Sequence, residues 1–274
     1  MEKRVYFVLG FMLIWAILSA VAAYARYWRK KAGWALLMYG RNALWREQRE
    51  YGAKQALIAG NKDAALLYAL SCPEKFDKEL PLIPFYRNKI KCVFADYYFP
   101  KRYHGWIAEE QWHFTQLVYQ FKEGRDNCAQ YFAQVFRTLH PACDLTIMFM
   151  PCSSEERYRE RFSSLNRFFL SFTGVCSGFN FIIFTSDREC KHLASKRSDV
   201  DEMSNYVISD AVKGRKVVIV DDLLTTGHSL FTYAEYLKNS GAEVIGAIFL
   251  AKTFLVPSIS KIKWKVWKQI LFSW

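Results

Sequence analysis

The sequence lacks closely spaced pairs of cysteine. Its seven cysteines are an odd number and lie far apart, so none forms the C-x-x-C spacing that zinc ribbons and thiol redox motifs need. Scattered free cysteines are typical of reduced thiols in a cytosolic environment, where most are small buried apolar residues. We therefore predict no metal site built from protein ligands. The cysteines are Cys72, Cys92, Cys128, Cys143, Cys152, Cys176 and Cys190.

Acidic residues are scarce relative to basic ones. The 274 residues include 26 Asp and Glu against 38 Lys and Arg, a formal net charge of +12. This excess favours phosphate-rich small molecules, nucleic acid or an anionic membrane surface as partners, and it does not choose among them. Because 52% of the residues are hydrophobic, the composition excludes a disordered chain and predicts a packed core.

Charged residues are absent from residues 5–25. An apolar stretch of about 20 residues is the length that spans a membrane as a helix. Lys3 and Arg4, offset by Glu2, precede the stretch, and a larger basic cluster within residues 26–31 follows it. By the positive-inside rule the cluster lies in the cytoplasm. We predict that residues 1–25 form a single-pass transmembrane anchor and that the remainder of the chain is cytoplasmic.

Two alternatives to the anchor stay open. The basic start, the apolar stretch and Ala23-Tyr24-Ala25 together resemble a cleaved signal peptide, although the stretch is longer than the usual hydrophobic region of about 7–15 residues. A buried core helix is the other alternative, although so long a run without charge is unusual in a soluble domain.

Residues 26–88 are predicted to be a helical juxtamembrane region and a linker. Residues 26–50 mix basic and aromatic side chains at helical spacing, which is typical of a helix at the membrane interface or of an ordinary amphipathic helix. Residues 51–70 predict a helical hairpin that turns at Gly60-Asn61. No second copy of this unit is visible, which argues against a repeat protein. The four prolines within 72–100 predict a linker and loop.

Residues 89–254 show the alternation of helix and strand that is typical of the α/β class. Short apolar runs without charge predict strands of a parallel sheet covered on both faces, and ligands of such sheets bind beyond the carboxyl ends of the strands. Gly241 follows the last helix as its C-terminal cap. The predicted strands are 144–150, 179–185, 217–220 and 244–250, and the predicted helices are 106–139, with a break at 124–127, 155–173 and 228–240.

The segment that follows the strand 217–220 carries the most specific chemistry. Asp221 and Asp222 come directly after VVIV and can accept hydrogen bonds from vicinal ribose hydroxyls. Hydroxyls and backbone N–H groups at the start of the next helix, in residues 225–229, form an anion pocket. Gly227 lets the backbone approach a phosphate closely. One short segment can therefore hold a sugar diol and a phosphate.

The string VVIVDDLLTTGHS resembles the signature of the type I phosphoribosyltransferases, which bind 5-phosphoribosyl-1-pyrophosphate (PRPP). The resemblance implies transfer of the phosphoribosyl group to an unidentified nitrogenous base, with release of pyrophosphate. It implies Mg²⁺ bound through PRPP, without direct protein coordination, and leaves a homodimer open. Asp221 and Asp222 would be the catalytic pair at the ribose hydroxyls. The 5-phosphate would lie on Thr225, Thr226, Gly227, His228 and Ser229.

A weaker similarity over about residues 96–253 looks closest to the ComF-like branch of competence proteins. It implies that Ser153, Ser154 and Arg157 bind pyrophosphate, with Lys191 on a lid. The alternative for the first three is a capped helix start that needs no ligand. The zinc-ribbon cysteines and the Arg-Gly-Phe-Asn string of that branch are absent, so details of substrate placement do not carry over.

Two other functions remain as alternatives. A phosphoribosyltransferase fold does not by itself establish turnover, so the chain is alternatively a non-catalytic sensor of PRPP or nucleotides at the membrane. The other is a ComF-like role in DNA uptake, with nucleic acid as a less favoured partner. The tail 255–274 interleaves lysine with tryptophan, as in a single-strand groove or a membrane surface. The strict alternation at 261–268 predicts an edge strand with lysines outward.

Overall fold

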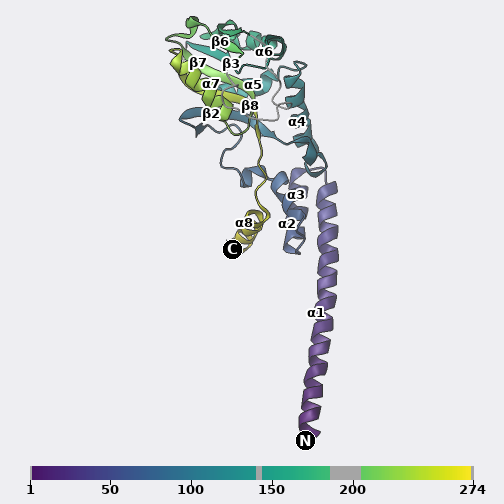
Figure 1. Ribbon diagram of the computed structural model, residues 1–274. Coiled ribbons are helices and arrows are strands. Elements are labelled where there is room, and N and C mark those ends of the chain that lie inside the picture. Colours follow the sequence, from purple (N-terminus) through teal and green to yellow (C-terminus); the bar gives the residue numbers. More distant parts are fainter. Residues whose placement is uncertain (1, 140–143, 186–204, 273–274) are drawn as a thin grey trace. The chain divides into compact units, whose positions relative to one another are not determined.

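The computed structural model describes residues 2–139, 144–185 and 205–272. The chain divides into two compact units (Figure 1). Unit 1 comprises Met1–Phe76, Arg102–Glu109 and Leu255–Trp274, and unit 2 comprises Asp77–Lys101 and Glu110–Phe254.

Unit 2 is built on a mostly parallel sheet, as the sequence predicts. Within the described residues the main sheet has six strands in the order β1-β2-β8-β7-β3-β4. β1 pairs with β2 antiparallel, and every other neighbouring pair is parallel. The strands are β1 (Phe85–Arg87), β2 (Ile90–Tyr98), β3 (Leu145–Phe149), β4 (Val175–Ser177), β7 (Lys216–Leu224) and β8 (Glu243–Thr253).

The apolar runs of the central strands contain no charged residue that would need contact with water, so these runs are buried. Every residue of β3 is buried, as are Val217 to Val220 of β7, as expected of a sheet covered on both faces. Phe149 of β3 stacks on Phe162 with ring centroids 4.9 Å apart. The helices of this unit are α4 (Glu109–Lys122), α5 (Ala129–Leu139), α6 (Glu155–Phe169) and α7 (His228–Asn239).

The strand order creates a switch point between β3 and β7. From β3 the chain passes outward to β4 on one side, and from β7 it passes outward to β8 on the other. The loops that leave β3 and β7 therefore diverge from adjacent strand ends. In open α/β sheets ligands bind in the crevice at such a point. The topology selects the loops after Met150 and after Leu224.

Two predicted elements of unit 2 are wrong in detail. Residues 179–185 do not form a strand of the main sheet. They form a short 3₁₀ helix, η3 (Phe179–Phe181), and then β5 (Ile182–Phe184), which pairs with β6 (Tyr206–Ile208) in a separate antiparallel sheet. Within this apolar run, Phe179 packs against Tyr158, with ring centroids 4.8 Å apart.

The predicted linker contains a central strand. β2 lies within residues 72–100 and pairs with β8 over most of its length. The prolines that suggested a loop, Pro81 and Pro84, precede the hairpin of β1 and β2 and do not interrupt it. The break predicted at 124–127 is confirmed. Gly124 there has φ +69°, and a Cβ would lie 2.7 Å from the carbonyl oxygen of Glu160.

Unit 1 is helical. The predicted hairpin with its turn at Gly60-Asn61 is confirmed. Gly52 packs so closely on Gly40 that a Cβ would lie 2.6 Å from the Gly40 Cα, which holds two helices in close backbone contact. The long helices are α1 (Glu2–Asn42), α2 (Arg46–Ile58), α3 (Ala64–Ser71) and α8 (Ile259–Phe272).

The tail 261–268 is helical, so the predicted edge strand is wrong. Ile262 and Val266 are each 1% exposed, whereas Trp264 between them is 66% exposed. Burial that recurs after four residues follows a helical period and not the two-residue period of a strand.

α1 is long and apolar enough to cross a membrane. The part of α1 with this length and apolar character is Gly10–Asn42. An 18-residue window within it has a mean hydropathy of 1.4, and none of that window is buried inside the protein. Such a helix near an N-terminus is also compatible with a signal sequence.

Candidate functional site

Asp221 and Asp222 lie near the end of strand β7 and not after it. β7 extends to Leu224, and Asp221 is in register with Phe249 of β8. The backbone N–H of Met150 donates to the carbonyl of Val220 at 2.8 Å, which continues the pairing of β3 and β7 up to the acids. The loop after Met150 therefore starts beside them, at the switch point.

Asp222 is a buried carboxylate held between two cations. It is 5% exposed, and its Oδ2 lies 3.3 Å from Nη1 of Arg161 on α6 and 3.7 Å from Nζ of Lys122 on α4. Burial lowers the pKa of Arg161, but the interactions with Asp222, Cys152 and Asp221 together outweigh it and raise that pKa. Oδ2 of Asp222 and Nε of Arg161 have no hydrogen-bond partner in the described structure. Both groups retain hydrogen-bonding capacity.

Asp221, the neighbour of Asp222, is half-buried and has a raised pKa. Burial, together with the charge of Asp222, raises the pKa of Asp221 from 3.8 to about 8, against the opposing effects of Arg161, the Asp222 N–H and Lys122. Its Oδ1 accepts a hydrogen bond from that N–H at 2.8 Å. Near neutral pH the acid pair therefore carries about one negative charge, as expected of two carboxyl groups that share one site.

The loop after Met150 is ordered by its own hydrogen bonds. Ser154 caps α6, because its Oγ accepts from the N–H of Arg157 at 3.3 Å, and Arg157 Nη1 donates to Ser153 Oγ at 3.4 Å. Asn205, 1% exposed, donates through Nδ2 to the carbonyls of Cys152 and Ser153, both at 3.1 Å. The capped helix start is thus confirmed, while the role in pyrophosphate binding stays a prediction. Lys191 lies outside the described residues.

The loop after β7 turns sharply at Gly227 before α7 begins at His228. Gly227 has φ +83°, which favours glycine. The N–H of His228 donates to Thr226 Oγ1 at 3.4 Å. Thr225, Thr226 and His228 are exposed, and Ser229 is half-buried. Residues 225–229 form a partly exposed turn at a helix N-terminus, where an anion is favoured by the backbone N–H groups and the helix dipole.

Arg87 supports this turn from a distant part of the sequence. Its Nη1 donates to the carbonyl of Thr226 at 2.8 Å, and its Cγ would lie 3.2 Å from a Cβ at Gly227. Nη2 of Arg87 donates to both carboxylate oxygens of Glu79, at 2.5 and 2.6 Å. Lys252, 5% exposed, forms ion pairs with Glu79 at 3.0 Å and with Asp77. The turn is thereby connected to β1 and β8.

No local pattern in the sequence indicates that Arg87 supports this turn. Arg87 lies 139 residues before Thr226, inside the stretch taken for a linker. Asn205 was missed for a similar reason, because its partners precede it by more than 50 residues.

A cavity of about 400 Å³ lies along α4. Tyr119 lines this cavity, and its hydroxyl lies 2.7 Å from the hydroxyl of Tyr98. The pKa of Tyr98 is raised by burial, by Tyr119 and by the charge of Asp222. The lining residues are Lys101, Trp112, Gln116, Tyr119, Gln120 and Arg125.

The fold and the site together define an α/β protein with an acidic strand end and an anion-type turn at one switch point. The family model of the phosphoribosyl transferase domain matches residues 179–269. An orotate phosphoribosyltransferase of Staphylococcus haemolyticus is 46% identical over 44 residues, 16% of this chain and 22% of the relative. Those of Bacillus cytotoxicus and Bacillus anthracis are also 46% identical over 44 residues, 21% of each relative.

Residues 179–269 of the chain therefore resemble a phosphoribosyl transferase domain. The match spans about a fifth of the length of these curated relatives.

The raised pKa of Asp221 predicts a pH dependence of stability. The folded protein retains the proton of Asp221 up to a pH of about 8, whereas the unfolded chain loses it near 3.8. Unfolding thus releases a proton in this window, so this group makes the free energy of unfolding fall as the pH rises from about 4 to about 8. We expect Asp221→Asn to show a weaker fall than the wild type in denaturant unfolding at several pH values.

Glu243→Gln is the matched control, because it removes an exposed carboxylate from β8. It should retain the wild-type slope of unfolding free energy against pH. Equal slopes for the wild type and Asp221→Asn would contradict the raised pKa.

Proposed function

We propose that the protein binds PRPP with Mg²⁺ and transfers its phosphoribosyl group to a nitrogenous base, with release of pyrophosphate. The observation that carries this proposal is that two features lie together at the end of β7, at the switch point. They are a pair of acids that can accept hydrogen bonds from a sugar diol and a turn suited to binding an anion. The match of residues 179–269 to the phosphoribosyl transferase domain supports it.

Different residues of the proposed site bind different parts of the substrate. Asp221 and Asp222 accept hydrogen bonds from the ribose hydroxyls, and residues 225–229 bind the 5-phosphate. Ser153, Ser154 and Arg157 bind pyrophosphate through hydroxyls and a guanidinium, with Lys191 as a further cation. The charge of Asp222 is balanced by Arg161 and Lys122, so these cations orient the acid.

The residues fit a magnesium ion held through the substrate. Oδ2 of Asp222 already lies beside two cations, which disfavours direct binding of a third. When bound through the hydroxyls and phosphates of PRPP, Mg²⁺ would neutralise negative charge on the leaving group.

The reaction is a substitution at the anomeric carbon. A ring nitrogen of the base donates its electron pair to that carbon, and the bond to pyrophosphate breaks with its electrons on the leaving oxygen. The positive charge that develops on the sugar lies next to the acid pair, and the departing polyanion lies next to the loop after Met150. Fixed charges and dipoles stabilise such a transition state without a covalent nucleophile.

The cavity along α4 is the proposed binding place of the acceptor. Trp112 and Tyr119 offer aromatic faces for a planar ring, and Gln116 and Gln120 offer amides for its edges. Lys101 favours an acceptor with an anionic group, whereas Arg125 already forms an ion pair with Glu123. Orotate, the compound in the names of the similar enzymes, is a base of this chemical class.

We further propose that α1 anchors the chain in a membrane with the following residues in the cytoplasm. The apolar window is wholly exposed in the protein, and the basic cluster within 26–31 follows it. The proposed transferase would then act at the inner membrane surface.

The first test is calorimetric titration of the full chain with PRPP and Mg²⁺. We expect binding by the wild type and loss of most of it in Asp221→Asn/Asp222→Asn, because an amide at position 222 cannot replace the charged acceptor there. Release of pyrophosphate on addition of orotate or another base would establish turnover. Binding without release would favour the sensor, and no binding by folded wild type would refute both.

The support of the phosphate turn by Arg87 gives a second test. Arg87→Met removes a charge-assisted hydrogen bond to the turn, a contact worth about 1.5–3 kcal/mol, so we expect PRPP affinity to fall roughly 10- to 100-fold. Lys89→Met removes the same charge from an exposed site on the same hairpin and should leave affinity unchanged. Equal affinities of the two variants would show that Arg87 does not position the turn.

The anchor is tested by fractionation. The wild type is expected to remain with membranes after an alkaline carbonate wash. Leu13→Arg/Leu18→Arg should reduce this fraction, because each arginine in the apolar span opposes insertion by about 3 kcal/mol. Leu44→Arg makes the same substitution at an exposed site outside the span and should have no effect. A mature chain that starts after Ala25 would instead identify a signal peptide.

A further inference from the structure

α8 is held on unit 1 by one of its faces. Ile262 and Val266 are buried, and α8 packs on α3. The hydroxyl of Tyr68 on α3 donates to Oε1 of Gln269 at 2.8 Å, and the ammonium of Lys265 lies 5.2 Å from the ring centre of Phe76. The buried face and these polar contacts fix the orientation of the helix.

The opposite face of α8 is also apolar, and it is exposed. Trp264, Trp267 and Leu271 are 66%, 52% and 67% exposed. Their spacing of three and then four residues places them in one stripe along the helix. A soluble helix needs only one apolar face, so a second one marks an interaction surface.

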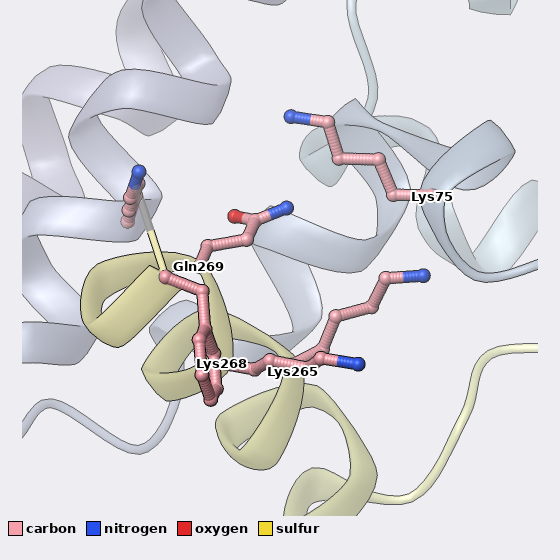
Figure 2. Close-up of a pocket in the computed structure, with 6 residues that line it drawn as sticks. Lys75, Lys265, Lys268 and Gln269 are labelled. Carbon is pink, nitrogen blue, oxygen red and sulfur yellow. The ribbon is translucent and has the colours of Figure 1, made fainter. Parts of the chain in front are cut away.

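Lysines flank this stripe and surround a cavity beside it. The ammonium of Lys268 lies 5.4 Å from the ring centre of Trp264. The cavity, of about 560 Å³, lies between α8, α2 and the short helix η1 (Pro73–Lys75). In Figure 2, Lys75 lies on one side of it and Lys265 and Lys268 on the α8 side. The lining residues are Lys54, Lys75, Lys265, Lys268, Gln269 and Phe272.

The positive charge of this cavity is largely uncompensated. Among the residues that the structure describes, Lys75 forms an ion pair with Glu50, whereas Lys54, Lys265 and Lys268 have no carboxylate partner. An open cavity with several lysines attracts a phosphate-bearing group, and an adjacent tryptophan stripe favours the boundary between lipid headgroups and acyl chains.

The position of α8 within unit 1 brings it to the level where a membrane surface would be. A Cβ at Gly33 of α1 would lie 3.2 Å from Ala59 and 3.5 Å from Asn61, so the turn between α2 and α3 packs beside Gly33. Gly33 follows the end of the apolar stretch at Ala25 by about 12 Å of helix. α3 therefore begins close to the headgroup region, and α8 packs on α3.

We propose that α8 is a membrane-surface helix that binds anionic phospholipid. Trp264, Trp267 and Leu271 insert at the headgroup boundary, and the lysine cavity takes up the phosphate-bearing headgroup. The proposal rests on the proposed anchoring by α1, and it gives unit 1 a second attachment to the same bilayer. Once α1 is inserted, the contact of α8 with the same surface forms at high effective concentration.

The test uses the full chain reconstituted in vesicles that contain phosphatidylcholine brominated in its acyl chains, which quenches nearby tryptophans. The protein has nine tryptophans. If Trp264 and Trp267 lie in the bilayer, Trp264→Phe/Trp267→Phe removes quenched emission, and the quenched fraction of the remainder falls. If they lie in water, the same variant removes unquenched emission, and the quenched fraction rises, which would overturn the proposal.

Trp15→Phe separates this outcome from failure of the anchor. Trp15 lies in the apolar span of α1, so its removal lowers the quenched fraction if the span is inserted. A lower quenched fraction in Trp15→Phe combined with a higher one in Trp264→Phe/Trp267→Phe would keep the anchor and refute the surface helix.

The lipid headgroup is tested with phosphatidylserine. Its addition to the vesicles should increase quenching of the wild type, and Lys265→Gln/Lys268→Gln should lose most of this increase. Lys89→Gln/Lys216→Gln removes the same charge from exposed sites of unit 2 and should retain it. Abolition of the increase by inorganic phosphate would assign the cavity to free phosphate, and equal quenching in both lipid mixtures would refute lipid binding.

Discussion

The proposed active site depends on the burial of Asp222 between Arg161 and Lys122. A carboxylate that is only 5% exposed is stable as an anion only when opposite charge compensates its lost hydration. The two cations come from different helices, α6 and α4, so the acid at the end of β7 fixes the positions of both around one strand end. Burial, together with the charge of Asp222, raises the pKa of the neighbouring Asp221, which therefore retains a proton near neutral pH. The charge state of the proposed site is thus a property of three elements together.

The sheet order determines what can surround this charge. Because β3 and β7 are adjacent but lead to opposite edges of the sheet, their loops diverge from neighbouring strand ends. One of these loops is the turn at Gly227 and the other is the loop after Met150. Each is held from a distance, the first by Arg87 and the second by Asn205. A small molecule with phosphate groups at both ends would meet groups that are already ordered.

Unit 1 combines features that a soluble transferase would not need. It contains a helix with an exposed apolar window, a second helix with two apolar faces, and a lysine cavity beside it. Placement at a membrane would give all three a common cause. Confinement to a surface raises the local concentration of any partner on the same surface, which connects unit 1 with either candidate role of unit 2, transferase or sensor.

The sequence by itself determined the α/β class, the strand, turn and helix of residues 217–240, the apolar span and the helical hairpin. These follow from local periodicity and from residues that are neighbours in the chain. It did not reveal β2 as a central strand, the helical state of residues 261–268, or the support of Thr226 by Arg87. Prolines at 81 and 84 are typical of a loop and argued against the strand β2. The regular alternation of lysine is typical of a strand and argued against a helix over residues 261–268. The tertiary structure decided these features, because each depends on partners far away in the chain: β8 for β2, α3 for α8, and a residue 139 positions distant for the turn.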